Sequence, residues 1–336
     1  MDKNKKYKET WLYGKKVIIT GAGSGFGKLL CEKLVMRYNC EVLGIGRTES
    51  KLLTLKNELS AQGYNNFSYK TFDAGNEENW INLKNEFLLS GRHIDVLINN
   101  AGVLPPFCKY EKLKNGELEK AFSANFFASA YSIKHLIYII KSRGSEETDL
   151  SAKSETDNQA ALTAKSIADG DIANIHAKSE NDNDKTAEFS KNKPKRPDRA
   201  IINVSSSAAL ACVIGTSAYT ASKSALAAFT KVISLENDDL YISLVMPGFS
   251  KTSIFRNQAE VDEKEKNLIA KVCGDPDKMT DNMIKGFIKQ KKRIITGADA
   301  HAMSVFGRLF PSFTDKAIKN VLKKANLATF YDVFGD

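Results

Sequence analysis

Short apolar runs alternate with longer segments of helical periodicity along the first half of the chain. Four runs have the length of buried strands, at residues 16–20, 41–45, 66–72 and 94–99. The segment after the first run carries apolar residues such as Leu30 and Leu34 at helical spacing. Because strands that alternate with helices are typical of βαβ units, this pattern predicts a parallel sheet.

The second half continues the alternation. It predicts helices over 118–140 and 219–235 and strands at 199–205, 241–246 and 293–296. With 336 residues, the chain is long enough for one large α/β domain or two small ones. We expect one doubly wound parallel sheet of the Rossmann type over 14–297, with an N-terminal tail over 1–13 and a C-terminal helical extension over 298–336.

One segment, residues 145–198, departs from the pattern. It holds 12 acidic and 8 basic residues, a single aromatic residue (Phe189), and a loose repeat in which AKSETDN returns as AKSENDN. Such a composition buries too little apolar surface to offset its ordering entropy, which predicts a disordered insertion. Its place before a strand puts it at the sheet edge opposite the ligand-binding edge. A regulatory or docking arm is the alternative.

Charge and cysteine content narrow the functional classes. The net charge is +9, but no basic stripe with interleaved aromatic residues indicates nucleic acid. Five scattered cysteines predict free thiols in a reducing compartment, and four isolated histidines predict no metal site. The basic N-terminus lacks the apolar segment of a secretory signal. We expect a cytoplasmic homo-oligomer.

A glycine-rich turn, TGAGSGFG, follows the first predicted strand directly. Gly21, Gly25 and Gly27 would let the backbone approach a pyrophosphate at the N-terminus of the next helix. The common G-x-G-x-x-G fingerprint is not matched in register, because Phe26 or Lys28 stands where the last glycine belongs. An ordinary tight βα loop is the alternative.

Arg47 follows the second predicted strand, where NAD-binding folds usually have an acidic residue for the ribose 2′-hydroxyl. A guanidinium pairs with a 2′-phosphate in bidentate fashion. The sequence therefore favours NADP(H) over NAD(H), with a solvent-facing arginine as the alternative.

The segment NVSSSAALACVIGTSAYTASK carries the main catalytic candidates. Tyr219 and Lys223 are four residues apart and share one helix face. An ammonium there would lower the pKa of the tyrosine toward neutrality and make it an acid–base group. Ser206 closes the preceding apolar run. A second Tyr-x-x-x-Lys pair, Tyr110 and Lys114, has no strand-end serine before it.

Further candidate residues close strands or lie in the long helix. They are Asp73, Asn100, Ala101, Gly102, Asn125, Pro247, Gly248 and Thr252. Together with the glycine turn and the Ser206, Tyr219, Lys223 set, their order along the chain resembles the short-chain dehydrogenase/reductase family. The resemblance covers roughly residues 14–296 without the insertion.

The resemblance implies reversible hydride transfer between NADP(H) and a small-molecule carbonyl/alcohol pair. Tyr219 would be the general acid or base, and Lys223 would lower its pKa and bind the nicotinamide ribose. Ser206 would orient the substrate oxygen, and Asn125 would hold a relay water. The resemblance assigns cofactor contacts to Gly21, Ser24, Gly25, Phe26, Gly27, Asp73, Asn100, Ala101, Gly102, Pro247, Gly248 and Thr252.

Substrate and partners are less constrained. Val103 to Phe107, with Phe249, Ile254 and Phe255, predict a pocket for a lipophilic substrate, and core packing is the alternative. The basic amphipathic stretch 306–325 covers the core of its own domain, forms a subunit contact or contacts a membrane surface. A non-catalytic NADP(H)-binding sensor or scaffold is a second hypothesis. A methyltransferase also has a glycine-rich turn, but has no role for Tyr219 and Lys223.

Overall fold

The computed structural model of the chain describes residues 5–142, 196–250, 273–325 and 330–334. Nearly all of the predicted insertion, and Thr252, Ile254 and Phe255, lie outside the described residues. All described residues belong to one compact unit.

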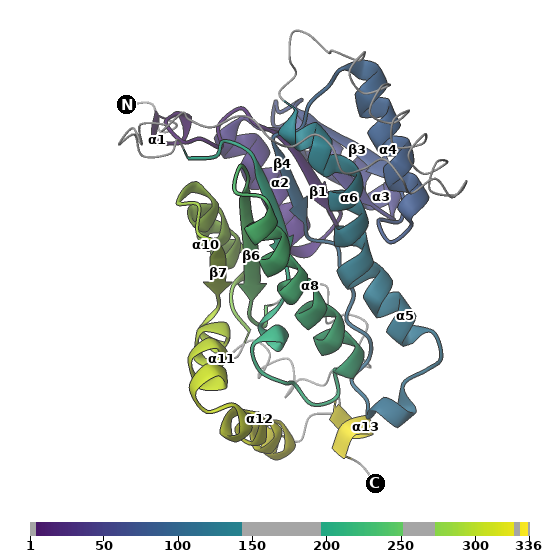
Figure 1. Cartoon of the computed structure of the whole chain (residues 1–336), viewed down its shortest axis with the longest axis vertical. Helices are drawn as coiled ribbons and strands as arrows, with labels where there is room; N and C mark the ends of the chain where they lie inside the picture. Colours follow the sequence, from purple (N-terminus) through teal and green to yellow (C-terminus); the bar gives the residue numbers. More distant parts are fainter. Residues whose placement is uncertain (1–4, 143–195, 251–272, 326–329, 335–336) are drawn as a thin grey trace, which may run out of the picture. The chain divides into compact units, whose positions relative to one another are not determined.

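Seven parallel strands form the sheet, in the order β3-β2-β1-β4-β5-β6-β7 (Figure 1). The strands are Lys16–Thr20 (β1), Glu41–Gly46 (β2), Phe67–Thr71 (β3), Val96–Asn99 (β4), Ala200–Val204 (β5), Tyr241–Pro247 (β6) and Arg293–Thr296 (β7). The order reverses between β1 and β4, which creates the switch point of a doubly wound sheet. The predicted fold class is confirmed.

Helices cover both faces of the sheet. They are Lys5–Lys8 (α1), Gly25–Tyr38 (α2), Glu49–Ala61 (α3), Glu77–Ser90 (α4), Glu117–Phe122 (α5), Ala128–Lys141 (α6), Ser217–Glu236 (α8), Pro276–Ile288 (α10), Ala298–Leu309 (α11), Pro311–Ala325 (α12) and Tyr331–Phe334 (α13). Along β1, Val17 and Ile19 join the apolar cluster beneath α2, α3 and α10, whereas Ile18 joins the one beneath α4, α6 and α8. Burial on both faces explains why the strands read as continuous apolar runs.

The long helix predicted over 118–140 runs without a gap over 117–141, but it is not α-helical throughout. A π-helical turn, Ser123–Phe127 (η2), separates α5 from α6. The side chain of Asn125 in this turn is fully buried and bonds to the backbone of Val103 on both its oxygen and its nitrogen. This tertiary contact accompanies the extra residue in the turn, and such turns concentrate at functional sites.

The C-terminal extension also differs from the single amphipathic stretch predicted over 306–325. The structure has two helices, α11 and α12, that meet at Pro311. Proline has no N–H to continue the helical hydrogen bonds, so α11 ends before it and α12 begins with it. Among the described residues, no helix has both the length and the hydropathy to cross a membrane.

Residues before Gly14 belong to the same core. Leu12 is fully buried, and the indole nitrogen of Trp11 donates to the Phe287 carbonyl over 3.1 Å. The segment predicted as a tail is thus attached to α10 by both apolar and polar contacts.

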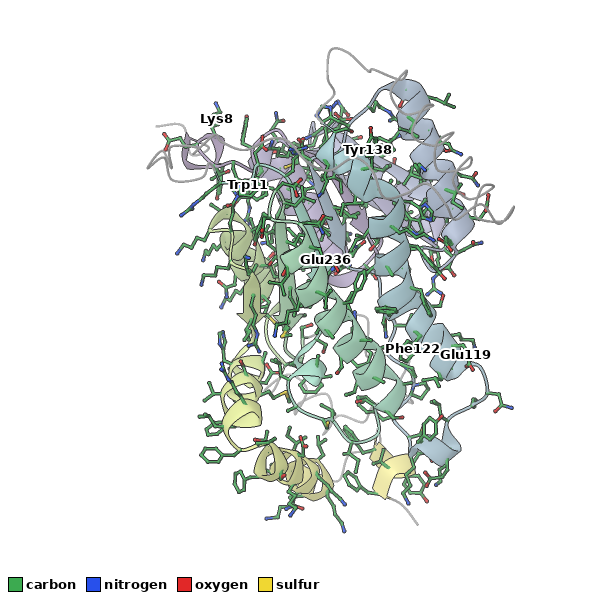
Figure 2. All side chains as sticks on the ribbon, in the orientation of Figure 1. Lys8, Trp11, Glu119, Phe122, Tyr138 and Glu236 are labelled. Atoms are coloured by element: carbon green, nitrogen blue, oxygen red, sulfur yellow. The ribbon has the colours of Figure 1, made fainter. Side chains whose placement is uncertain are left out.

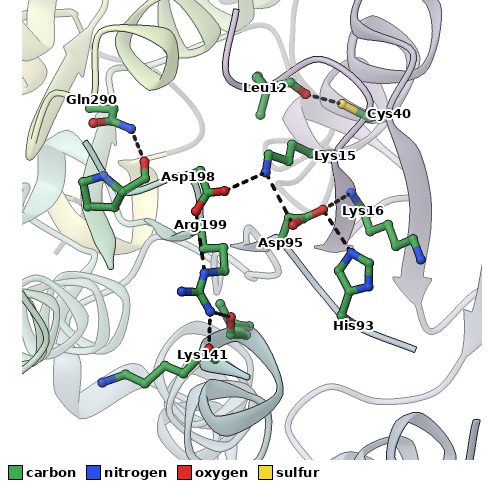
Figure 3. A network of polar contacts seen from close by, with 12 residues as sticks. Leu12, Lys15, Lys16, Cys40, His93, Asp95, Lys141, Asp198, Arg199 and Gln290 are labelled. Atoms are coloured by element: carbon green, nitrogen blue, oxygen red, sulfur yellow. Dashed lines mark hydrogen bonds and ion pairs between the residues drawn. The ribbon is translucent and has the colours of Figure 1, made fainter. Parts of the chain in front are cut away.

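A polar network holds the amino-terminal edge of the sheet (Figure 3). Arg199 donates to the carbonyls of Ile140 and Lys141 at the C-terminus of α6. A carboxylate oxygen of Asp95 accepts from the Lys16 amide over 2.8 Å, and the other lies 3.5 Å from Nζ of Lys15. The chain therefore leaves α6 and re-enters β5 at the edge opposite the carboxyl ends of the strands.

We predict that Asp95→Ala destabilises the fold by about 1–2 kcal/mol, because it leaves a partly buried backbone amide without its acceptor. Urea unfolding measures the loss. Glu86→Ala, which removes an exposed ion pair with Lys70, is the control and should change stability by less than about 0.5 kcal/mol. Equal effects of the two substitutions would contradict this reading of the network.

Candidate functional site

A cavity of about 410 Å³ opens at the carboxyl ends of β1, β4, β5 and β6, and an adjoining one of about 170 Å³ continues it past β2 and β3. Predicted site residues lining the first are Gly21, Ser24, Gly25, Phe26, Arg47, Asn100, Gly102, Ser206, Tyr219, Lys223, Pro247 and Gly248. Asp73 and Ala101 line the second. Gly27 and Asn125 line neither cavity, and Thr252 lies outside the described residues.

The glycine turn brings the N-terminus of α2 against the end of β1. Gly21 and Gly25 have φ of +69° and +54°, which side chains rarely tolerate. A Cβ on Gly21 would lie 2.9 Å from Nδ2 of Asn100, and one on Gly27 would overlap the Gly21 carbonyl. Gly27 therefore permits close helix–strand packing, while the first turn of α2 presents its unpaired N–H groups toward the cavity.

Thr20 holds the two sides of the switch point together, a role that sequence reasoning missed. Its buried hydroxyl oxygen accepts from the backbone amides of Asn100 and Ala101 over 3.0 and 2.9 Å. Nδ2 of Asn100 donates to the Thr20 carbonyl over 3.1 Å. The threonine before the first glycine of the turn was the only sequence signal for this contact.

Ser206 and Tyr219 meet in the first cavity. Ser206 lies two residues after the end of β5 with extended backbone, and its hydroxyl oxygen accepts from the Ala208 amide over 3.2 Å. Tyr219 lies in the first turn of α8. Burial raises the pKa of Tyr219 above its usual value, and the hydrogen bond with Ser206 offsets only part of that rise.

Lys223 is buried one helical turn later. Its ammonium donates to the Val204 carbonyl over 2.9 Å, and burial lowers its pKa to about 8. The sequence-based expectation that Lys223 lowers the pKa of Tyr219 toward neutrality is wrong for the chain by itself. The cost of desolvating the ionised form dominates the pKa shift of each group.

Asn125 is anchored rather than free. Its oxygen accepts from the Val103 amide over 2.7 Å, and its nitrogen donates to the Val103 carbonyl and to the Ser222 hydroxyl over 3.0 and 2.9 Å. Both amide hydrogens are therefore used within the protein. Through these bonds Asn125 joins the loop after Gly102 to the residue that precedes Lys223.

A buried amide pair lies directly below the cavity. Asn99 on β4 and Asn203 on β5 are register partners, and their side chains bond over 2.9 Å. Ser132 on α6 donates to Asn99 over 2.7 Å, and Asn203 donates to Thr230 on α8 over 2.9 Å. The four residues tie the two strands to the two helices that flank the site.

Asp299, at the start of α11, was also missed. Its carboxylate accepts from the Phe249 amide over 2.7 Å, and a side chain at Gly248 would overlap it. Burial raises the pKa of Asp299. The Pro247–Gly248 turn is thereby fastened to the C-terminal extension, which explains why glycine stands after the proline.

The far end of the cavity is apolar. Leu104, Phe107 and Val213 line it and pack against Phe330 and Val333 near the C-terminus. The rings of Phe107 and Phe330 have centroids 4.6 Å apart. Residues distant in the sequence thus form one wall.

Two exposed cations, Arg47 and Lys51, line both cavities. Neither forms an ion pair within the part of the chain that the structure describes. Lys28, by contrast, lies 2.6 Å from Glu58 and lines neither cavity. The decoy Tyr110 is 61% exposed and also lies outside both cavities.

Comparison with known proteins gives one family. The short chain dehydrogenase profile matches residues 15–146 and 186–263, more than half of the chain. The glycine turn, the strand-end residues and the Ser206, Tyr219, Lys223 set all lie within the matched ranges.

Individual relatives match shorter stretches. A probable NADP-dependent dehydrogenase of Haemophilus influenzae is 35% identical over 26% of this chain and 32% of its own length. A benzil reductase ((S)-benzoin forming) of Saccharomyces cerevisiae is 30% identical over 38% of this chain and 50% of its own length. The chain thus matches only a third to a half of these relatives.

A solved structure shares the fold over most of its length. It is a short chain dehydrogenase/reductase of Burkholderia phymatum in complex with NAD, with a TM-score of 0.62 and 18% identity. The match covers 88% of this chain and 94% of that one.

The buried ammonium predicts a pH-dependent stability. Below pH 8, Lys223 is protonated in both folded and unfolded chains. As pH rises from about 8 toward 10.5, the folded chain has released the proton that the unfolded chain still binds. Folding stability of the wild type should therefore rise by about 3 kcal/mol relative to Lys223→Met over this window. Urea unfolding of both proteins across these pH values measures the difference, and parallel profiles would contradict it.

Proposed function

Because the chain belongs to the short-chain dehydrogenase/reductase family, we propose that this oxidoreductase transfers hydride between NADP(H) and the carbonyl/alcohol pair of a lipophilic small molecule. The observation that carries the proposal is the convergence of Ser206, Tyr219 and Lys223 in the cavity that also borders the glycine turn. Similarity of fold alone would not indicate an acid–base group in this cavity.

The two adjoining cavities together form a groove that suits an extended dinucleotide. Its glycine turn leaves no room for side chains at Gly21 and Gly27, so backbone N–H groups of α2 can reach a pyrophosphate. Asp73 and Ala101 would border the adenosine end, and Lys223 and Pro247 the nicotinamide end. When bound, the nicotinamide cofactor gives or accepts the hydride, and this chain provides position and proton transfer.

Tyr219 is the proposed proton donor. Its raised pKa keeps the phenol protonated at neutral pH, which is the form that donates to a carbonyl oxygen during reduction. Ser206, hydrogen-bonded to the phenol, is placed to orient the same oxygen. In oxidation the phenolate forms, and the Lys223 ammonium and the Ser206 hydroxyl both favour it. Asn125 acts as a positioning residue for the α8 turn that carries this set.

Arg47 and Lys51 support NADP(H) over NAD(H). Two unpaired cations beside the adenosine end can neutralise a 2′-phosphate, and Arg47 rather than an acidic residue stands directly after β2, where a carboxylate would accept from a free 2′-hydroxyl. Among similar proteins, one is named NADP-dependent and one was solved with NAD, so the preference rests on these two side chains.

The apolar wall supports a lipophilic substrate. Leu104, Phe107 and Val213 extend the cavity beyond Tyr219, and the C-terminal Phe330 and Val333 back them. The yeast relative is named for reduction of benzil, an aromatic diketone. We infer a ketone, aldehyde or alcohol with an apolar body for this chain.

Tyr219→Phe should lower NADPH-dependent reduction of an active lipophilic ketone by roughly a hundredfold or more, because it removes only the transferable proton. NADPH affinity, followed by cofactor fluorescence, should stay within about twofold, since the ring and its packing remain. Tyr110→Phe is the matched control and should behave like the wild type.

Retained activity of Tyr219→Phe would refute the catalytic assignment. A wild type that binds NADPH but turns over no member of a carbonyl and alcohol panel would favour a non-catalytic sensor instead.

Arg47→Asp should lower the ratio of kcat/KM for NADPH over NADH by about ten- to a hundredfold, because the carboxylate repels a 2′-phosphate and accepts from a free hydroxyl. Lys51→Ala should lower the ratio less, by about fivefold. Lys28→Ala, whose side chain pairs with Glu58 outside the cavities, is the control. A ratio unchanged in both cavity variants would mean that other groups select the cofactor.

A further inference from the structure

The outward face of α11 is an exposed apolar stripe. Ala302, Val305, Phe306 and Leu309 have the spacing of one helix face, and the opposite face, with Ala300 and Met303, packs inward. Phe310 and Phe313 continue the stripe beyond α11. The exposed fractions are 53% for Val305, 51% for Phe306, 63% for Leu309, 57% for Phe310 and 70% for Phe313. Soluble monomers rarely expose so many large apolar side chains together.

The outward face of α12 is basic. Lys316, Asn320, Lys323 and Lys324 are exposed, whereas Thr314, Ile318 and Leu322 turn inward. Of the apolar residues that the sequence places at helical spacing on this helix, Leu322 packs inward, whereas Val321 is 66% exposed. An apolar outward face and a basic one therefore meet at Pro311.

No acidic side chain of α11 or α12 is available on the outward faces to offset the positive charge of the α12 lysines. Their only carboxylates are Asp299 and Asp315. Asp299 is held by the Phe249 amide, and Asp315 accepts from the Cys212 amide over 3.1 Å. Arg308 adds a fifth exposed cation to the four lysines at 316, 319, 323 and 324.

We propose that these outward faces, the docking face, bind the surface of a membrane that contains anionic lipids. Apolar side chains of α11 and the phenylalanines beside Pro311 would enter the headgroup region, and the α12 lysines would contact lipid phosphates and carboxylates. Charge decides between lipid and a second copy of this chain. Two docking faces packed on each other would oppose lysines with lysines, without a carboxylate to separate them.

The position of the docking face fits an apolar substrate, although the proposal does not depend on the enzymatic one. Both helices lie beyond the carboxyl ends of β6 and β7, and the side chains on their outer sides project away from the sheet (Figures 1 and 2). On the inner faces of the two helices, Met303 and Leu322 pack against the apolar cluster that contains Phe107 and Val213. A membrane at the docking face would therefore lie next to the end of the cavity assigned to the substrate.

Co-sedimentation of the full chain with vesicles tests the proposal. Vesicles of phosphatidylcholine with phosphatidylserine should bind the protein, pure phosphatidylcholine should bind it at least tenfold more weakly, and added salt should release it. Phe306→Ser/Leu309→Ser/Phe313→Ser and Lys316→Glu/Lys323→Glu should each weaken binding by tenfold or more. Each lysine contributes about fivefold to partition near an anionic surface.

Two control variants carry matched changes elsewhere. Leu88→Ser/Leu89→Ser alters apolar side chains that are 51% and 89% exposed on α4. Lys285→Glu/Lys289→Glu makes the same charge change at two exposed positions, one on α10 and one directly after it. Both should bind vesicles like the wild type. Thermal melting shows whether each variant is folded. The salt dependence is measured on the wild type, so that test does not depend on the folding of any variant.

Absence of wild-type binding to phosphatidylserine vesicles would overturn the proposal, as would equal loss in the control variants or salt-independent binding. The alternative outcome is a wild type that binds no vesicles and sediments as a dimer, with the triple serine variant sedimenting as a monomer. In that case the docking face is an interface between two copies of this chain, and the lipid assignment fails.

Discussion

The site depends on the buried hydrogen bond between Asn99 and Asn203. The two residues are register partners on β4 and β5, at the centre of the sheet. A slip of one residue would leave each amide against apolar neighbours without a partner, which costs a few kcal/mol. Ser132 and Thr230 extend the constraint to α6 and α8. Ser206 follows β5, and Tyr219 and Lys223 lie on α8, so this polar pair aligns the elements that position the residues assigned to chemistry.

Burial, more than neighbouring charge, sets the protonation of the site. Lys223 has a pKa near 8 because its ammonium lies in the core, and Tyr219 keeps its proton for the same reason. A carbonyl of β5 holds the ammonium in place of a carboxylate. The chain therefore presents a protonated phenol at neutral pH. Formation of the phenolate requires further stabilisation, which in the proposed reaction accompanies the transfer itself.

The C-terminal extension connects the site to the molecular surface. Its first residues hold the turn after β6 through Asp299, its last described residues back Phe107, and its helices pack on the apolar wall between these points. The inner faces of α11 and α12 thus pack against the rest of the protein. Their outer faces have no partner of their own in the described part of the chain, and it is there that the membrane proposal applies.

Local pattern in the sequence determined the order of strands and helices, the parallel sheet and the residues at its carboxyl edge. These features depend on hydrophobic period, glycine conformation and chain order, which neighbouring residues specify. Strands at 16–20 and 293–296 agree with the structure to the residue. Only the tertiary structure decided the π turn at Asn125, the contacts of Thr20 and Asp299, the second cation at Lys51 and the outward stripe of α11. It also reversed the expected pKa shift of Tyr219. Each of these rests on a partner distant in the chain or on the depth of burial, and neither is encoded in the spacing of residues along the sequence.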